Sequence, residues 1–132
     1  MRFETSNGLQ LQLRPVSTVT LDAIINELGG FDLLLELSNQ TPEQVERHFR
    51  AYEPQRLQAY LAAQRRQLLY CLGWGVVNTP PPEAIAELEL LELNSTYPNV
   101  QRAHWLVYAA GLQREDKARL IGAVMALTYR SA

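Results

Sequence analysis

Residues 55–77 form the stretch that most constrains the fold, because they contain no proline and no glycine before Gly73. Their apolar residues recur at the spacing of one helix face, and the polar residues fall mostly on the opposite side. We therefore predict a central packing helix of about 18 residues, roughly 27 Å long, which ends at Gly73 and Gly75 before three consecutive prolines. The apolar positions are Leu57, Leu61, Leu68 and Leu72, and the polar ones are Arg56, Arg65, Arg66 and Gln67.

Length and composition describe an ordinary globular chain. It has 132 residues, of which 47% are hydrophobic and 20% are charged, so we predict a single domain over residues 1–132. A net charge of −2 gives no bulk attraction to nucleic acid or to an anionic membrane, and no apolar run approaches the roughly 18 residues that a membrane helix needs. We therefore expect neither as a partner. The single cysteine, Cys71, excludes an internal disulfide and fits a reducing cytoplasm.

An N-terminal β-hairpin is predicted over residues 1–16, where apolar and polar residues alternate on both sides of Ser6-Asn7-Gly8. A three-residue loop with Gly8 in the left-handed region keeps the apolar residues on one face, whereas a two-residue loop would mix the faces. Because an isolated hairpin is marginally stable in water, the Phe3/Leu11 face must lie on the helices or on another chain. The expected opposite pairs are Arg2 with Gln12, Phe3 with Leu11, Glu4 with Gln10 and Thr5 with Leu9.

The remaining residues, 17–132, indicate a body of five to six helices, so the predicted fold class is mainly α with an N-terminal β-hairpin. Gly29-Gly30 closes a first helix, and Thr41-Pro42-Glu43-Gln44 has the cap, proline and glutamine of a helix start. The short apolar segment 31–37 fits a helix or a strand equally well. The side chains expected to be buried are Leu21, Ile24, Ile25, Leu28, Val45, Phe49, Tyr52, Ile85, Leu88, Leu91, Ala103, Trp105, Leu106, Ala109, Leu120, Ile121, Val124 and Leu127.

Groups suited to catalysis or metal binding are nearly absent from the sequence. Cys71 lies on the apolar side of its helix, so a buried structural thiol is a better interpretation than a catalytic pair with His104. The acids between Glu83 and Glu92 lack the alternating oxygen ligands and turn glycine of a calcium loop, and a solvated helix face explains them. The sequence therefore predicts no enzyme and no catalytic, cofactor or metal site.

Five arginines between residues 47 and 66 admit two interpretations with different functions. They can pair with Glu43, Glu46 and Glu53 on helix surfaces, or they can contact DNA phosphates. The second role calls for a recognition-helix pattern or interleaved aromatic residues, which the stretch lacks. The five are Arg47, Arg50, Arg56, Arg65 and Arg66.

Three features follow one another along the chain. A short strand over residues 9–16 runs into Leu-Arg-Pro-Val and then a helix. A central helix rich in Tyr, Ala, Arg and Leu begins near Tyr60 and ends in Gly75-Val76-Val77. A helix bearing Trp105, a short acidic junction and an apolar helix then close on Leu127-Thr128. In this order the features resemble the tail assembly chaperones of bacteriophages with long non-contractile tails.

The resemblance implies a non-enzymatic role in the cytoplasm of an infected bacterium and absence from the mature virion. Such chaperones coat the long helical tape measure protein, keep it soluble, and are displaced as tail tube subunits polymerise around it. The implied partners are the tape measure protein, the tail tube protein and further copies of the chain. An amphipathic helix exposes an apolar stripe that aggregates unless another apolar surface covers it.

The residues that make such a contact are predicted from the apolar pattern of this chain, because the family has no residue-level motif that can be carried over to it. Large apolar side chains are the best candidates, with the alternative that the same side chains fill the core. The predicted partner-binding residues are Trp74, Trp105, Tyr108, Phe3 and Leu11.

Two other functions remain open. A structural virion subunit, such as a head–tail adaptor or neck protein, would form a ring and persist in the particle. A small DNA-binding regulator would use the arginine-rich stretch, and its affinity for duplex DNA would fall steeply with salt.

Overall fold

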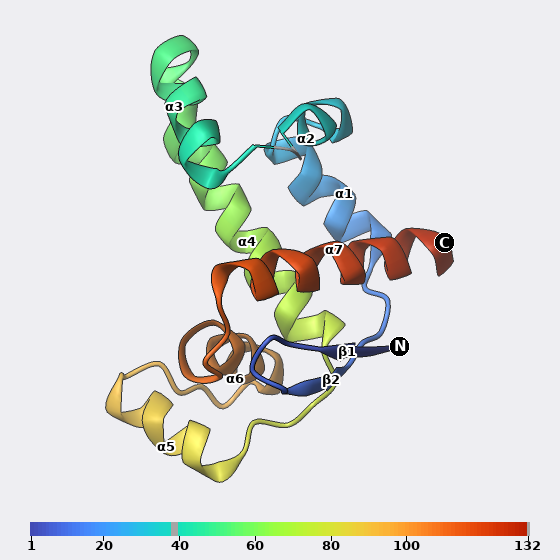
Figure 1. Cartoon of the computed structure of the whole chain (residues 1–132), viewed down its shortest axis with the longest axis vertical. Coiled ribbons are helices and arrows are strands. Elements are labelled where there is room, and N and C mark those ends of the chain that lie inside the picture. Colours follow the sequence, from blue (N-terminus) through green and yellow to red (C-terminus); the bar gives the residue numbers. More distant parts are fainter. Residues whose placement is uncertain (38–39, 132) are drawn as a thin grey trace. The chain divides into compact units, whose positions relative to one another are not determined.

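The structure, a computed structural model of the chain, describes residues 1–37 and 40–131; Ser38, Asn39 and Ala132 lie outside the described residues. It confirms a mainly α fold with an N-terminal β-hairpin (Figure 1). The described residues form seven α-helices, of which α2 covers the segment that periodicity left open. The elements are β1 (Arg2–Glu4), β2 (Gln10–Gln12), α1 (Thr18–Glu27), α2 (Phe31–Leu37), α3 (Pro42–Tyr52), the 3-10 helix η1 (Pro54–Arg56), α4 (Leu57–Gly75), α5 (Pro82–Leu90), α6 (Pro98–His104), the π-helix η2 (Trp105–Ala109) and α7 (Arg114–Ser131).

The chain divides into two compact units. Unit 1 combines Met1–Thr18 with Leu68–Ala132, and unit 2 is Val19–Gln67. Helix α4 contributes its first part to unit 2 and its last part to unit 1. The single domain over residues 1–132 stays a prediction. None of the described helices is long and apolar enough to cross a membrane.

The hairpin in unit 1 has the predicted register, with Phe3 opposite Leu11 and both side chains buried. Gly8 has a φ of 85°, in the left-handed region that glycine adopts without steric cost. A three-residue turn therefore keeps the apolar residues of both strands on one face, as predicted.

The second edge of the hairpin is paired as well. The backbone N–H of Arg14 donates to the Gly75 carbonyl at 2.9 Å, and the N–H of Val77 donates to the Gln12 carbonyl at 3.0 Å. These bonds join β2 to the segment that follows α4. A two-stranded hairpin, marginal by itself, is stabilised by this additional pairing and by the burial of its apolar face.

Asp116, in the first turn of α7, connects that helix to the hairpin turn. The backbone N–H and the hydroxyl of Ser6 donate to its carboxylate at 2.9 and 2.6 Å, and the N–H of Gln113 donates at 3.2 Å. The two Ser6 bonds are the main reason that the pKa of this buried carboxyl lies below its usual value. Asn7 adds a second connection, since its amide donates to the Ala110 carbonyl at 3.0 Å.

Two glycines allow α4 to approach its neighbours in unit 1. A Cβ at Gly73 would lie 2.7 Å from the Asn99 carbonyl oxygen, and a Cβ at Gly75 would lie 2.6 Å from Val124. Helix α4 ends at Gly75 as predicted, but the two glycines have a further role. They are buried in its last turn and allow α6 and α7 to pack against the helix.

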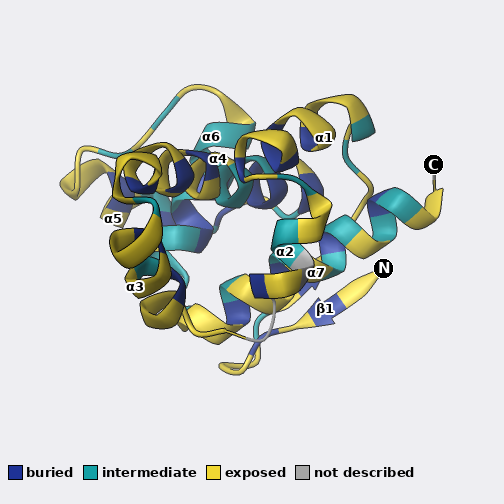
Figure 2. Cartoon of the chain, turned by 90° about the horizontal axis from the view of Figure 1, so that it is seen from above, coloured by how far each residue is buried: buried dark blue, intermediate teal, exposed yellow. Residues whose placement is uncertain are grey.

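Unit 2 is built on apolar helix faces. The stripe of α1 is buried as predicted, and buried positions recur along that helix with exposed positions between them (Figure 2). The capping box at Thr41 is also confirmed, with the Thr41 hydroxyl accepting from the Gln44 N–H and the Gln44 side chain accepting from the Thr41 N–H. The Phe49 and Tyr60 rings lie 4.6 Å apart and join α3 to α4. The buried residues are Leu21, Ile24 and Ile25 of α1 and Leu28 directly after it.

Some burial predictions were wrong. Tyr52 is 76% exposed, because α3 ends there and the ring lies beside the exposed His48. Leu91 is half exposed, because α5 ends at Leu90 and its buried face consists of Ala84 and Leu88. The remaining predicted residue of α5, Ile85, is only partly buried.

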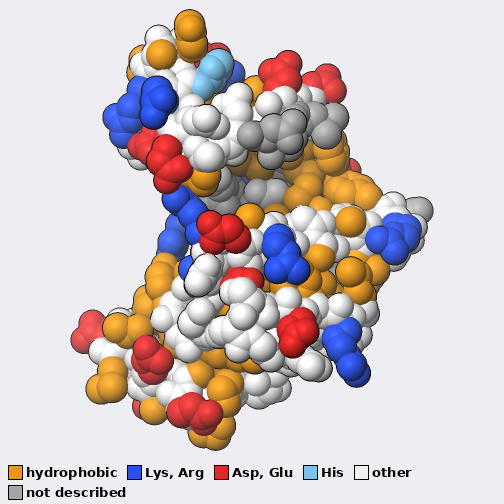
Figure 3. Space-filling model, viewed as in Figure 1, with side chains coloured by type: hydrophobic (Ala, Val, Ile, Leu, Met, Phe, Trp, Pro, Cys, Tyr) orange, Lys and Arg blue, Asp and Glu red, His pale blue; other side chains and the backbone are white. Residues whose placement is uncertain are grey.

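Surface ion pairs account for several arginines of unit 2. Arg50 pairs with Glu46 at 2.7 Å, and Arg56 pairs with Glu53 at 2.9 Å, as the surface-pairing interpretation predicted. Basic and acidic side chains lie together over α3 (Figure 3). Arg66 pairs with Glu27 of α1, a contact that the sequence did not reveal.

Candidate partner-binding sites

The five predicted contact residues all lie in unit 1, but they differ in exposure. Phe3, Leu11 and Trp105 are buried, with 8%, 1% and 4% of their surface exposed. Their side chains are covered by other parts of the chain, and their contact with a partner stays a prediction. Trp74 and Tyr108 are 47% and 38% exposed and present apolar area at the surface.

The backbone around Trp74 is held by two arginines. The Arg14 side chain donates from Nε to the Trp74 carbonyl at 2.7 Å, and Arg102 donates from Nη1 to the Gly73 carbonyl at 2.8 Å. A second Arg102 bond, from Nε, reaches the Asn78 carbonyl at 2.6 Å. The last carbonyls of a helix have no partner within it, and positive charge there complements the helix dipole. Trp74 therefore projects from a fixed helix end.

Sequence analysis missed both arginines, because nothing local marks them. Arg14 and Arg102 lie 60 and 29 residues from the carbonyls that they meet. Partial burial lowers the pKa of Arg102, and the positive charge of Arg14 lowers it further. The two positive charges near this helix end repel each other. The hydrogen bonds that both arginines donate to carbonyl oxygens at the negative end of the helix dipole offset this repulsion.

A small pocket of about 170 Å³ lies beside Trp74, between the end of α4 and the start of α6. Its lining is mostly apolar and aromatic. Tyr108 extends this surface, since its ring lies 5.9 Å from the ring of His104. We call the following residues the Trp74 surface: Leu69, Tyr70, Trp74, Val100, His104 and Tyr108.

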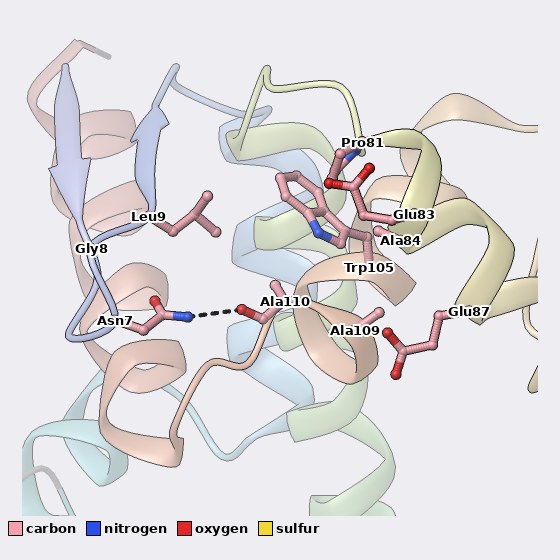
Figure 4. A pocket seen from close by; sticks show the side chains of 10 residues that line it. All are labelled: Asn7, Gly8, Leu9, Pro81, Glu83, Ala84, Glu87, Trp105, Ala109 and Ala110. Atoms are coloured by element: carbon pink, nitrogen blue, oxygen red, sulfur yellow. Dashed lines mark hydrogen bonds between the residues drawn. The ribbon is translucent and has the colours of Figure 1, made fainter.

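A larger pocket of about 440 Å³ lies in unit 1 between the hairpin turn, α5 and η2 (Figure 4). We call it the Trp105 pocket. Its volume falls within the range of roughly 300–1,000 Å³ that is usual for ligand sites. The residues that line it are Asn7, Gly8, Leu9, Pro81, Glu83, Ala84, Glu87, Trp105, Ala109 and Ala110.

The π-helix η2 sets the position of Trp105 in this pocket. Such single wide turns are rare in proteins, and those that occur are often found at functional sites. Trp105 is one of the residues that line this pocket, and only 4% of its surface is exposed. Sequence analysis missed this pocket, because a π-helix has no reliable signal in a single sequence.

The groups considered for catalysis in the sequence are Cys71 and His104. Cys71 is fully buried, as predicted, and burial raises the pKa of its thiol to about 12. The Nδ1 of His104 lies 2.7 Å from the Leu93 carbonyl and donates to it. Among the described residues, no group of three or more His, Cys, Asp or Glu side chains is arranged to hold a metal ion.

Comparisons with protein-family models, with curated proteins and with solved structures return no match for this chain. Function must therefore be inferred from the residues themselves. The two features of unit 1 that offer a site are the Trp74 surface, which is apolar and projecting, and the Trp105 pocket, which is concave and partly polar.

Proposed function

We propose that this protein is a non-enzymatic tail assembly chaperone of a long-tailed bacteriophage, which binds the tape measure protein in the infected cell and keeps it soluble. The observation that carries the proposal is the half-exposed Trp74, held on a fixed helix end beside an apolar pocket. The order of sequence features that resembles this chaperone family supports the same function.

The Trp74 surface suits an apolar helical partner. Tryptophan provides much contact area and is enriched among residues that dominate binding energy. Because the carbonyls of Gly73 and Trp74 already receive bonds from two arginines, ordering this segment on binding costs little entropy. One aliphatic side chain of an amphipathic helix can enter the pocket of about 170 Å³, while Trp74 and Tyr108 cover its neighbours.

A contact of this size is compatible with release. A single projecting aromatic residue and a small pocket provide a modest affinity per copy, and many copies along one long helix provide the combined affinity. In this proposal the tail tube protein displaces the copies one after another, and contacts between copies strengthen the coat. The deeply buried thiol of Cys71 fits a protein whose function is binding and not catalysis.

Co-expression tests the proposal. The chain is produced together with the tape measure protein of the same phage, and the soluble fraction of the tape measure protein is measured. We expect the wild-type chain to keep it soluble and to co-purify with it. Trp74→Ala should weaken the complex by about 30-fold, the loss expected for a residue that dominates an interface.

A matched control variant distinguishes loss of the partner contact from loss of folding stability. Tyr52→Ala removes another exposed aromatic side chain, but from unit 2, and should leave solubilisation unchanged. Both variants should unfold cooperatively near the wild-type temperature, because Tyr52 is largely exposed and Trp74 is half exposed. A tape measure protein that is equally insoluble with and without the chain would refute the proposal. Recovery of the chain from purified virions at ring stoichiometry would instead support the head–tail adaptor.

A further inference from the structure

We infer that Asn7 is a site of spontaneous deamidation, at which the backbone nitrogen of Gly8 attacks the side chain and the amide becomes a carboxylate. The folded hairpin turn slows this reaction, and the product no longer connects the turn to Ala110, the residue that follows η2. The inference rests on the chemistry of the turn and is independent of the proposed function.

The first observation is the sequence and exposure of the turn. Asn7 is the only asparagine of the sequence that a glycine follows. Glycine has no Cβ to obstruct the approach of its own nitrogen to a neighbouring side chain. Asn7 and Gly8 are both exposed, and a Cβ added at Gly8 would meet no described heavy atom within 4 Å beyond its chain neighbours. The turn therefore has room for the reaction and access to water.

The reaction proceeds through a cyclic intermediate. The Gly8 nitrogen loses its proton to solvent base and forms a bond with Cγ of Asn7, while the bond from Cγ to Nδ2 breaks. The nitrogen that leaves takes up a proton and departs as ammonia, and a succinimide ring remains. Water then opens the ring at either of its carbonyl carbons and leaves aspartate or isoaspartate. One water is consumed and one ammonia is released, and no oxidant or reductant takes part.

Hydrogen bonds of the folded turn oppose the first step. The Gly8 N–H, which must lose its proton, donates to the Thr5 carbonyl at 3.0 Å. The Asn7 amide is held at both ends, because Nδ2 donates to the Ala110 carbonyl at 3.0 Å (Figure 4) and Oδ1 accepts from the Thr5 hydroxyl. The nitrogen and Cγ can meet only after these bonds break. The folded chain therefore reacts from a transiently open turn.

The product cannot remake the contact with Ala110. A carboxylate has no hydrogen to donate, so it would place a negative oxygen against the carbonyl that Nδ2 now meets. The neighbouring Ser6 already holds one negative charge close to the turn, since its N–H and hydroxyl donate to Asp116 at 2.9 and 2.6 Å. Two carboxylates this close along the chain repel each other. Deamidation therefore detaches the hairpin turn from the segment after η2.

Incubation of the full chain in mildly alkaline buffer tests the inference, with the product at each asparagine quantified by peptide mass spectrometry. The reference is the peptide acetyl-Thr-Ser-Asn-Gly-Leu-amide, which has the same neighbours but no folded turn. In urea, Asn7 should be the first asparagine of the chain to react, at the rate of the peptide. In the folded chain Asn7 should react about tenfold more slowly, the factor that one or two hydrogen bonds provide.

Two substitutions distinguish the hold on Asn7 from a general loosening of the hairpin. Thr5→Val removes the hydroxyl that holds Oδ1 and should speed deamidation of the folded chain severalfold. Asn78→Ala removes bonds on the other edge of the hairpin, to the Gln12 N–H at 2.8 Å and the Gln10 carbonyl at 3.1 Å, and should leave the rate at Asn7 unchanged. The comparison of folded chain and peptide requires no variant, so it holds even if one of these fails to fold.

The product itself is reproduced by Asn7→Asp, whose Tm should lie below that of wild type. Four results would overturn the inference. They are equal rates in the folded chain and the peptide, no product at Asn7 of the folded chain when the peptide has reacted to completion, equal acceleration by Thr5→Val and Asn78→Ala, and an unchanged Tm of Asn7→Asp. None of these measurements involves the tape measure protein, so they succeed or fail separately from the co-expression test.

Discussion

Units 1 and 2 are stabilised in different ways, although both are mainly helical. In unit 1, polar side chains reach across the sequence to fix the backbone: Asp116 bonds Ser6, Asn7 bonds Ala110, and Arg14 bonds Trp74. In unit 2, Arg50 pairs with Glu46 within α3 and Arg56 pairs with the nearby Glu53, while Arg66 of α4 reaches Glu27 of α1. The apolar core of unit 2 includes Leu21, Ile25 and Phe49.

This difference bears on function, because both candidate sites lie in unit 1. A binding site gains affinity when its residues are held in place before the partner arrives. The long-range hydrogen bonds of unit 1 fix the turn, the helix end and the π-helix that line the two sites. Whether unit 2 opens without unit 1 is a separate question, which hydrogen exchange answers. Three substitutions test this contrast.

The largest effect is expected for Phe49→Ala in the core of unit 2. Phe49 is 1% exposed and lies against Tyr60, so the cavity should lower the free energy of unfolding by about 3–5 kcal/mol. Denaturant titration measures the loss. Native-state hydrogen exchange should show it in the amides of α3, while those of α7 keep their protection. Equal loss of protection in α3 and α7 would show that the two units unfold together and would remove the contrast.

A smaller effect, dependent on pH, is expected for Asp116→Asn in unit 1. The pKa of Asp116 is lowered in the folded state, so its charge adds stability above the unfolded pKa of about 3.9, and this stability is lost as pH falls through the lower folded pKa. The Tm of the variant should lie below that of wild type at pH 7, and the gap should shrink as the solution is acidified below about pH 4. A gap that is the same at both pH values would mean that the Ser6 bonds do not depend on the carboxylate charge.

The smallest effect is expected for Arg50→Ala on the surface of unit 2. Its ion pair with Glu46 joins two exposed side chains one helical turn apart. Such pairs contribute about 0.3–0.5 kcal/mol, and salt screens them. Denaturant titration at low and high salt should find a loss no larger than this, and a smaller one at high salt. A loss that exceeds that of Asp116→Asn would contradict the view that local charge pairs add little to unit 2.

Sequence patterns were sufficient wherever a feature depends on neighbours along the chain. The register of the hairpin follows from alternation and from Gly8, which alone fits a left-handed turn position there. The stop at Gly75 and the capping box at Thr41 were equally readable. Burial was predicted correctly for the apolar stripe of α1, but Tyr52 and Leu91 near helix ends are exposed, and Ile121 and Leu127 inside α7 are only partly buried. At a helix end no further turn continues the buried face, so helical periodicity no longer predicts which side chains are buried there.

By itself, the sequence determined the fold class, the hairpin, most helix boundaries and the buried state of Cys71, because these follow from propensity, periodicity and turn chemistry. Only the tertiary structure decided which aromatic residues are exposed. Trp74 and Trp105 are the same residue type in the sequence, yet Trp74 is 47% exposed at a helix end and Trp105 is 4% exposed and lines a pocket. The reason is that exposure depends on what distant segments cover, and the arginines, the acidic helix α5 and the π-helix that form the two sites come together only in the folded chain.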